Sequence, residues 1–367
     1  MNASRTEAFT IPPHLRELDR YEPGLSIEQV QRRPGVTRVV KLASNENPLG
    51  PSPLALEALA RALPSLHRYP DGPATALRSA LASRLGVDAT QLVIGNGSTD
   101  LIDLLARAFL GPEDNAVISE RAFARFAQVV QARNGRAKVV PMRALTHDLV
   151  AMVAAVDPRT RLMYVANPNN PTGTWNRRRE VDALVDALPP HVLLVLDEAY
   201  FEYADDPEYP DGIGYVGTAA PVIVLRTFSK IYGLAGLRVG YGIAAPRVIE
   251  SLDTVREPFN SNSLGQVAAL AALDDREHVE QALALNSREK PRLVTELRRR
   301  GLEPLPSLAN FLCVDLGRDA APVFAHLLDR GVIVRPLRAY QLPSALRVSV
   351  GTAEENDVFL AALDASL

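Results

Sequence analysis

One lysine in this sequence stands where its amine could act as a nucleophile. Lys230 lies in the stretch RTFSKIYGLAGLRVG, directly after the apolar run 222–225. Partial burial and nearby cations lower the pKa of a lysine, and an unprotonated lysine can form a Schiff base with an aldehyde. Thr227, Ser229 and Arg238 could together bind a phosphate, because a guanidinium offers a two-pronged donor. Lys230 taken alone is equally compatible with a surface lysine in a glycine-rich turn.

A carboxylate and a phenol follow the apolar run 192–196. Asp197 could form an ion pair with a protonated ring nitrogen, the contact by which a protein keeps a pyridine ring able to draw electrons. Tyr200 could donate a hydrogen bond to a phenolic oxygen on the same ring. The alternative is a helix N-cap aspartate followed by a packed tyrosine.

Two polar turns follow other apolar runs. Asn170 lies in NPNNPTG after the run 162–166, and its amide could reach a ring oxygen, although an isolated turn of this kind favours a plain structural role. Ser98 and Thr99 lie in GNGSTD between the run 92–94 and a helical segment. Glycines before a helix N-terminus leave amides free to bind a phosphate, and simple N-capping by either residue is compatible with that role.

The elements that must position these groups form a repeating pattern. Short runs rich in Val, Ile and Leu alternate with amphipathic segments, which predicts a mostly parallel sheet covered by helices on both faces. Ligands of such sheets bind at the carboxyl ends of the strands, so we expect the polar groups to lie close together. The expected strands are 92–94, 116–118, 162–166, 192–196, 222–225 and 239–244.

The pattern changes in the last third of the chain. A helical region is expected over 264–300, with Pro291 as a boundary or kink. Strands are expected at 311–315, 332–335 and 346–350, with a helix at 322–330. We therefore predict an α/β fold with three parts: an N-terminal arm joined to part of the small domain (1–40), a large domain (41–250) and a smaller α+β C-terminal domain (251–367).

Composition narrows the function classes. The 367 residues carry a formal net charge of -3 without a block of like charge, so a nucleic-acid partner is not expected. No apolar run is long enough for a membrane span and the first residues are polar, so we expect neither membrane insertion nor a signal peptide and predict a cytoplasmic protein. Cys313, the single cysteine, lies in an apolar run and is expected as a buried thiol. The histidines lack metal-ligand spacing, so we expect no metal site.

The polar stretches together resemble the fold-type I pyridoxal-phosphate aminotransferases. Within that group the chain resembles the histidinol-phosphate aminotransferases over nearly its whole length. The resemblance is carried by KLASNENPLG (41–50), RYPDG (68–72), NNPTG (169–173), DEAY (197–200), SK (229–230) and LRVSVG (346–351).

The resemblance implies pyridoxal 5'-phosphate as cofactor and a role for each motif residue. Lys230 would hold the cofactor as a Schiff base and then move the substrate proton, with Asp197 keeping the ring nitrogen protonated. Asn170 and Tyr200 would bond the phenolic oxygen of the ring. Phe123 would stack on the ring, with Phe126 as the alternative. Tyr69 would reach the phosphate of a partner subunit, which implies a homodimer. The phosphate ligands would be Ser98, Thr99, Thr227, Ser229 and Arg238.

Two arginines are candidates for the substrate end. Arg335 and Arg347 lie on expected strands, where a guanidinium is costly without an anion, although a structural salt bridge would also satisfy it. Tyr21 and Asn47 match positions that line the substrate pocket in the family. The resemblance implies ping-pong transfer from histidinol phosphate to 2-oxoglutarate, an amino donor and a 2-oxo acid, in histidine biosynthesis.

Two departures from the family pattern concern the acceptor. Leu25 stands where relatives often have a lysine, and Gln341 stands where they often have a glycine. An aromatic-amino-acid aminotransferase and a decarboxylase of a phosphorylated amino acid therefore remain as alternatives on the same scaffold. A non-catalytic ligand-binding relative is disfavoured by the intact set of Lys230, Asp197 and Asn170.

Overall fold

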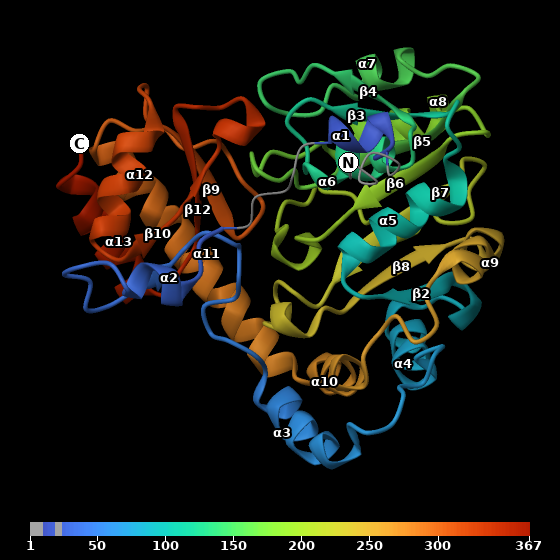
Figure 1. Cartoon of the computed structure of the whole chain (residues 1–367), viewed down its shortest axis with the longest axis horizontal. Coiled ribbons are helices and arrows are strands. Elements are labelled where there is room, and N and C mark those ends of the chain that lie inside the picture. The colour runs from blue at the N-terminus through green and yellow to red at the C-terminus, as the bar shows by residue number, and fades with distance from the viewer. Residues whose placement is uncertain (1–9, 19–23) are drawn as a thin grey trace, which may run out of the picture.

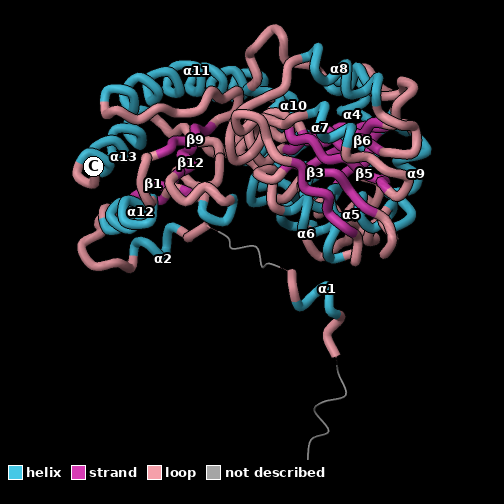
Figure 2. Tube along the Cα trace, turned by 90° about the horizontal axis from the view of Figure 1, so that it is seen from above, coloured by secondary structure: helices cyan, strands magenta, loops and turns pink. Residues whose placement is uncertain are grey.

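The computed structural model describes residues 10–18 and 24–367. Its strands form two separate groups, each covered by helices (Figures 1 and 2). The larger group carries the residues expected at the cofactor, and the smaller carries the two arginines expected at the substrate. The helices of the described residues are α1 (Pro13–Arg16), α2 (Ile27–Gln31), α3 (Pro53–Ala62), α4 (Thr75–Leu85), α5 (Ser98–Phe109), α6 (Arg125–Ala132), α7 (Leu149–Ala154), α8 (Arg178–Ala187), α9 (Pro246–Val255), α10 (Ser263–Asp274), α11 (Arg276–Arg299), α12 (Ala320–Asp329) and α13 (Ala353–Asp364).

Within the described residues the large sheet has seven strands in the order β2-β8-β7-β6-β5-β3-β4. All neighbours pair in parallel except β8, which runs antiparallel to both β2 and β7. The loop 228–239 therefore joins two adjacent antiparallel strands, and Lys230 lies in it. The strands are β2 (Leu92–Gly95), β3 (Asn115–Ser119), β4 (Arg136–Val140), β5 (Thr160–Ala166), β6 (Leu193–Asp197), β7 (Val222–Thr227) and β8 (Gly240–Ala244).

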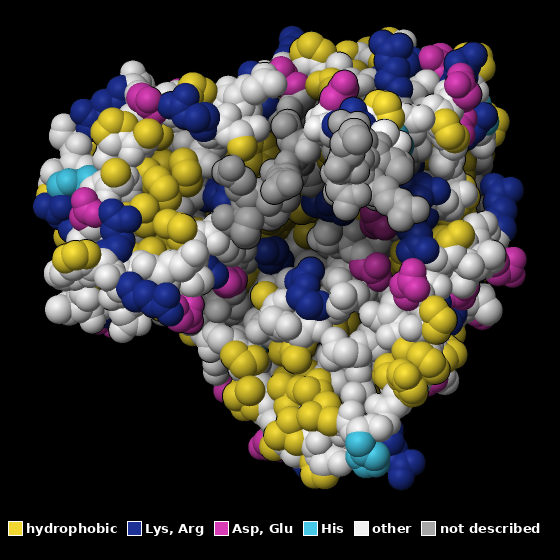
Figure 3. Space-filling view, viewed as in Figure 1, with side chains coloured by type: hydrophobic (Ala, Val, Ile, Leu, Met, Phe, Trp, Pro, Cys, Tyr) yellow, Lys and Arg dark blue, Asp and Glu magenta, His cyan; other side chains and the backbone are white. Residues whose placement is uncertain are grey.

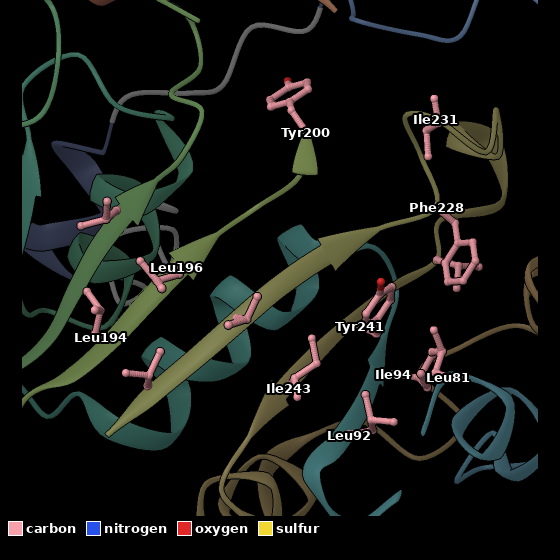
Figure 4. Packing of buried hydrophobic residues seen from close by; sticks show 14 of the residues in the cluster. Leu81, Leu92, Ile94, Leu194, Leu196, Tyr200, Phe228, Ile231, Tyr241 and Ile243 are labelled. Atoms are coloured by element: carbon pink, nitrogen blue, oxygen red, sulfur yellow. The ribbon is translucent and has the colours of Figure 1, made fainter. Parts of the chain in front are cut away.

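Both faces of this sheet are buried, as continuous apolar strands require. Alternate strand side chains pack with helices α4, α7, α8 and α10 on one face and with α5, α6 and α9 on the other. Figure 4 shows part of the first cluster, with Tyr200 just beyond the end of β6. Neighbouring residues of one strand thus face opposite cores, and this alternation fixes which residues at a strand end point the same way.

Strand β4 was absent from the expected strands. Arg136 and Lys138 interrupt its apolar residues, and β4 pairs with β3 alone at the edge of the sheet. An edge strand is half exposed and tolerates charged residues, so it lacks the continuous apolar signal of the central strands.

The smaller group of strands forms a pair and a three-stranded antiparallel sheet among the described residues. The single strand expected over 332–335 is wrong, because β10 pairs with β1 whereas β11 pairs with β12. The turn at Val334 places Arg335 on β11 directly opposite Arg347 on β12. The strands are β1 (Val40–Lys41), β9 (Phe311–Asp315), β10 (Val332–Ile333), β11 (Arg335–Pro336) and β12 (Ala345–Ser349).

Cys313 lies opposite Arg347 on β9, and the expected buried thiol is confirmed. Burial raises the pKa of this thiol to about 12, so it stays protonated at neutral pH. This cysteine is a packing residue of the small sheet.

The helical region expected over 264–300 is divided at a different residue. Helix α10 ends at Asp274, and Asp275 caps α11 by accepting the backbone N–H of His278. Helix α11 then continues through Pro291, so the boundary expected at that proline is wrong. Helix α10 packs in the large-sheet core although it follows residue 250.

Candidate active site

A cavity lies between the carboxyl ends of the large-sheet strands and the facing strands of the small sheet. It encloses about 980 Å³, part of which is open solvent. Most residues expected at the cofactor and substrate line this one cavity, although they are spread over 250 positions of sequence. The lining includes Ser98, Thr99, Phe123, Asn170, Asp197, Tyr200, Thr227, Ser229, Lys230, Arg238, Arg335 and Arg347.

Lys230 presents its amine to this cavity from the loop between β7 and β8. Its Nζ donates a hydrogen bond to the backbone oxygen of Ser44 at 3.0 Å. Burial lowers the pKa of Lys230 to about 8, and the charges of Arg347 and Arg238 act in the same direction. About a tenth of the amine is therefore unprotonated at pH 7, far more than for an ordinary lysine, and the unprotonated form is the nucleophile.

Asp197 is the last residue of β6 and has a buried carboxyl oxygen without a partner. Among the described residues, no group forms a hydrogen bond with its Oδ1. Burial raises the pKa of Asp197 to about 7, against a hydrogen bond from Ala199 and the charge of Lys230. A buried oxygen without a partner is costly, so this carboxyl is placed for a donor or cation that enters the cavity.

Helix α5 begins at the cavity and makes an anion site with Arg238. Gly97 precedes the helix at φ +82°, and no side chain caps the first amides. A φ of +82° favours glycine at position 97, and a Cβ there would lie 2.6 Å from an Arg238 guanidinium nitrogen and displace it. Free amides, a helix dipole and a guanidinium together favour a phosphate group. Thr227 and Ser229 line the same end of the cavity.

The structure separates the two phenylalanines that the sequence left open. Phe123 lines the cavity. Phe126 is fully buried and stacks on Tyr164 with ring centroids 4.7 Å apart. Phe123 is therefore the aromatic residue available to a ring bound in the cavity.

The small sheet contributes two guanidinium groups to the cavity. Arg335 and Arg347 lie in cross-strand register and both line it. Like charges directly opposite one another destabilise a sheet unless an anion lies between them. Arg347 also donates to the backbone oxygen of Ala43 at 2.6 Å and to the side-chain oxygen of Asn170. This last bond leaves the amide nitrogen of Asn170 as its remaining polar atom.

Two residues expected in the site lie outside this cavity, and a third is not among the described residues. Asn47 does not line the cavity; its amide donates to the backbone oxygen of Ile231 at 2.8 Å, next to Lys230. Tyr69 is 82% exposed and stacks on Phe259 outside the cavity of its own chain. Tyr21 lies outside the described residues.

Ser44, Asn45 and Tyr340 line the cavity but had no role in the sequence analysis. Ser44 and Asn45 lie within KLASNENPLG, a stretch that carried the resemblance, so the signal was present without an assigned contact. Their partners are distant in sequence, as with Asn45 and the hydroxyl of Tyr200 at 2.8 Å. Pairings of this kind follow from the tertiary fold alone.

Metal and membrane features were searched in the same described residues. No group of three or more His, Cys, Asp or Glu side chains gathers there in a way that could hold a metal ion. None of the helices in that part of the chain combines the length and apolar character needed to cross a membrane.

Residues 37–363 match the family model of the class I and II aminotransferases. The chain therefore belongs to this family, and the fold-type I expectation is confirmed. A histidinol-phosphate aminotransferase 2 of Pseudomonas fluorescens is 49% identical over 353 residues, covering 96% of this chain and 95% of the relative. A protein of the same name from Methylococcus capsulatus is 50% identical over 358 residues, covering 96% of both chains.

A solved structure is also similar over nearly the full length. The histidinol-phosphate aminotransferase of Sinorhizobium meliloti, in complex with pyridoxal-5'-phosphate, gives a TM-score of 0.89 at 33% identity and covers 98% of both chains. The similarity includes both groups of strands, because so little of either chain is left uncovered. The fold and the family expected from the sequence are thus both supported by whole-chain matches.

Proposed function

We propose that this aminotransferase uses pyridoxal 5'-phosphate to transfer the amino group of histidinol phosphate to 2-oxoglutarate, in histidine biosynthesis. The observation that carries the cofactor assignment is the unpartnered Oδ1 of Asp197, which is buried in the cavity that Lys230 also lines. A protonated ring nitrogen would donate a hydrogen bond to that oxygen, and the aldehyde of the cofactor would react with the amine of Lys230. The substrate assignment is supported by relatives of about 50% identity that carry this name.

Each part of the cofactor has a chemically matched group in the cavity. The N-terminus of α5, Thr227, Ser229 and Arg238 would hold the phosphate, and Phe123 would cover one face of the ring. Asn170 and Tyr200 would donate to the phenolic oxygen. When bound, pyridoxal phosphate supplies the aldehyde that accepts an amino group and the ring that accepts electrons.

The residues of the chain would supply binding and proton transfer. The amine of Lys230, with a pKa near 8, would take the proton from the substrate Cα and deliver it to C4′ of the cofactor. Asp197 would stay ionised opposite the positive ring nitrogen. The donor leaves as a keto product before the acceptor enters, so we expect ping-pong kinetics.

Arg335 and Arg347 would bind the anionic ends of both substrates. Their cross-strand register places two guanidinium groups on one side of the cavity. A carboxylate of glutamate and the phosphate of histidinol phosphate can each accept paired hydrogen bonds from arginine. One anion site can therefore serve both half-reactions.

The test is a set of half-reactions with the purified, cofactor-loaded protein. Histidinol phosphate, glutamate, phenylalanine and tyrosine are each added alone, and loss of the visible cofactor band is followed. We expect histidinol phosphate and glutamate to remove the band fastest. A faster reaction with phenylalanine or tyrosine would support the aromatic-amino-acid alternative. Carbon dioxide release from a phosphorylated amino acid, added in a fifth reaction without a keto acceptor, would support the decarboxylase alternative.

We also propose that the active unit is a homodimer. Figure 3 shows hydrophobic surface in the region where Figure 1 places α3. Tyr69 and Phe259 stack nearby as an exposed aromatic pair. Exposed apolar area of this kind is typical of a protein interface. The exposed leucines of α3 and its flanks are Leu49, Leu54, Leu56, Leu63 and Leu66.

In that dimer Tyr69 would reach the phosphate of the partner subunit. Light scattering during size exclusion should give a particle mass of two chains. The double variant Leu56→Glu, Leu63→Glu should reduce the particle mass to that of a single chain. A single-chain mass for the unmodified, active protein would contradict the dimer.

We further propose a cytoplasmic location. The domain division at residues 40 and 250 stays a prediction.

A further inference from the structure

Three consecutive residues after β1 contact three different groups of the cavity. The backbone oxygen of Ala43 accepts from Arg347 at 2.6 Å, and that of Ser44 accepts from Lys230 at 3.0 Å. The side-chain amide of Asn45 donates to the hydroxyl of Tyr200 at 2.8 Å. The segment 43–45 therefore joins the substrate arginine, the reactive lysine and the tyrosine.

The orientation of the Asn45 amide is fixed by Ser349. The hydroxyl of Ser349 lies 3.0 Å from Asn45 Oδ1 and donates to it. The backbone N–H of Asn45 donates back to the same hydroxyl at 2.8 Å. Asn45 is 1% exposed and has a φ of 55°, a left-handed conformation that asparagine tolerates better than most residues. With Oδ1 occupied by Ser349, only Nδ2 can face Tyr200.

This orientation determines how the Tyr200 hydroxyl can be used. Because its oxygen accepts from Asn45, its own hydrogen is left to donate to another group. In residues 10–18 and 24–367, Asn45 is the one hydrogen-bond partner of that hydroxyl. Tyr200 is 4% exposed and lines the cavity, so the hydrogen is directed at whatever the cavity holds.

Burial keeps that hydrogen on Tyr200. Burial raises the pKa of Tyr200 to about 12, against the charge of Arg347 and the hydrogen bond from Asn45. Asp197 also faces the phenol, and Lys230 Nζ lies 5.7 Å from its ring centroid. The phenol therefore remains protonated over the neutral range and can act as a donor.

We propose that Asn45 is a positioning residue, held by Ser349, that makes Tyr200 a hydrogen-bond donor to the phenolic oxygen of the cofactor. This inference rests on the proposed function, because it needs pyridoxal phosphate in the cavity. Ser349 lies two residues after Arg347 on β12, so one strand carries both a substrate-binding group and the support for Tyr200. The segment 43–45 connects the two parts of the site.

The test is a pH titration of the visible absorption of the cofactor-loaded protein. A hydrogen bond donated to the phenolic oxygen favours its deprotonated form, so losing the bond moves the titration of the bound cofactor to higher pH. In Asn45→Asp the carboxylate can only accept, so it takes the Tyr200 hydrogen, and we expect an upward shift of about one pH unit. We expect a smaller upward shift in Asn45→Gly, which keeps the left-handed backbone without adding a charge, and the smallest in Ser349→Ala.

The matched control repeats Asn45→Gly in a Tyr200→Phe background. The glycine substitution should then cause no further shift, because the hydroxyl through which it acts is absent. An equal shift in both backgrounds, or no shift in the presence of Tyr200, would overturn the inference. The two claims separate in the unmodified protein: if it has no cofactor band that reduction fixes to Lys230, the proposed function fails first. A normal titration with unchanged Asn45 variants would remove only the role of Asn45.

Discussion

Two carboxylates stand side by side at the end of β6, and their surroundings differ. Glu198 accepts from Nε and Nη2 of Arg226 at 3.0 and 2.8 Å and from the backbone N–H of Gly212 at 2.8 Å. Arg226 is itself buried and also pairs with Asp211. Asp197, one residue earlier, has a buried oxygen that no described residue satisfies.

The difference shows how to separate a structural charge from a ligand-binding one. Successive residues of a strand point to opposite faces, so one side of β6 holds a complete ion pair and the other an incomplete one. Glu198 needs nothing from outside, and its partners come from β7 and the loop before it. Asp197 is completed only by a group that enters the cavity. Both carboxylates are buried, so burial alone does not distinguish the structural one from the one that faces the cavity.

The largest expected effect is on activity in Asp197→Asn. In the proposed site the positive ring nitrogen would then lose its partner, and we expect kcat to fall by about 10³-fold. Folding stability should not fall, because no protein contact of Oδ1 is lost. The matched control is Glu198→Gln, measured by steady-state kinetics on equal amounts of folded enzyme. A kcat within a few-fold of normal in Asp197→Asn would break the comparison.

Next in size is the loss of stability in Glu198→Gln. This change leaves Arg226 buried without its main counter-charge, and we expect the free energy of unfolding to drop by about 3 kcal/mol. The kcat of the folded fraction should change little, because Glu198 does not line the cavity. Urea unfolding measures the free energy of unfolding. Active-site titration gives the concentration of folded enzyme from which kcat is calculated. If Glu198→Gln lost activity without losing stability, Glu198 would belong to the reactive site and the structural role assigned to it would be wrong.

A smaller effect concerns the pH dependence of the cofactor-free protein. The pKa of Asp197 is raised to about 7 from an ordinary value of 3.8, so the folded state binds more protons than the unfolded state between those pH values. Stability therefore falls as pH rises through this window, by up to about 1.4 kcal/mol per pH unit from this group. Asp197→Asn should reduce that slope in urea unfolding between pH 4 and 7, and the remaining slope should come from Glu198 and Glu202, whose pKa values burial also raises to about 7. An identical slope in both proteins would argue against the raised pKa.

The smallest effect is expected when the complete ion pair is replaced as a unit. Glu198→Leu combined with Arg226→Met removes both buried charges but leaves the backbone N–H of Gly212 without its acceptor, so the loss should be about 1 kcal/mol. The double variant should therefore be more stable than Glu198→Gln, as measured under the same unfolding conditions. If the double variant were as unstable as Glu198→Gln, the intact ion pair itself would stabilise the fold, and the cost of an unpaired Arg226 would not explain the loss in the single variant.

The sequence was sufficient for the parts of the site that follow strands. Apolar runs located six of the seven described strands of the large sheet, and the polar residues after them lie in one cavity because parallel strands end at a common edge. The family and fold followed from motifs at those ends. The aromatic register at Phe123 and Phe126 required the structure, because both residues fit the motif and only packing separates them.

Other features depend on contacts between distant residues and could not be inferred from local patterns. Edge strand β4 lacks an apolar run, and the strand break at Val334 is visible only from its two different partners. The support of Tyr200 by Asn45 joins positions 155 residues apart. Pro291 was misread because a proline boundary is a local rule, whereas the capping residue Asp275 begins α11. Local rules locate elements more reliably than they locate the contacts among them.

We propose that the amine of Lys230 binds the aldehyde of one cofactor and that the carboxylate of Asp197 pairs with the nitrogen at the opposite end of the same ring. The most direct measurement is borohydride reduction of the yellow, cofactor-loaded protein, followed by peptide mass mapping. We expect the cofactor mass on Lys230 alone, and Lys230→Ala should carry no label even with cofactor bound noncovalently at the phosphate site. Label on another lysine, or a colourless protein that takes none, would contradict the claim.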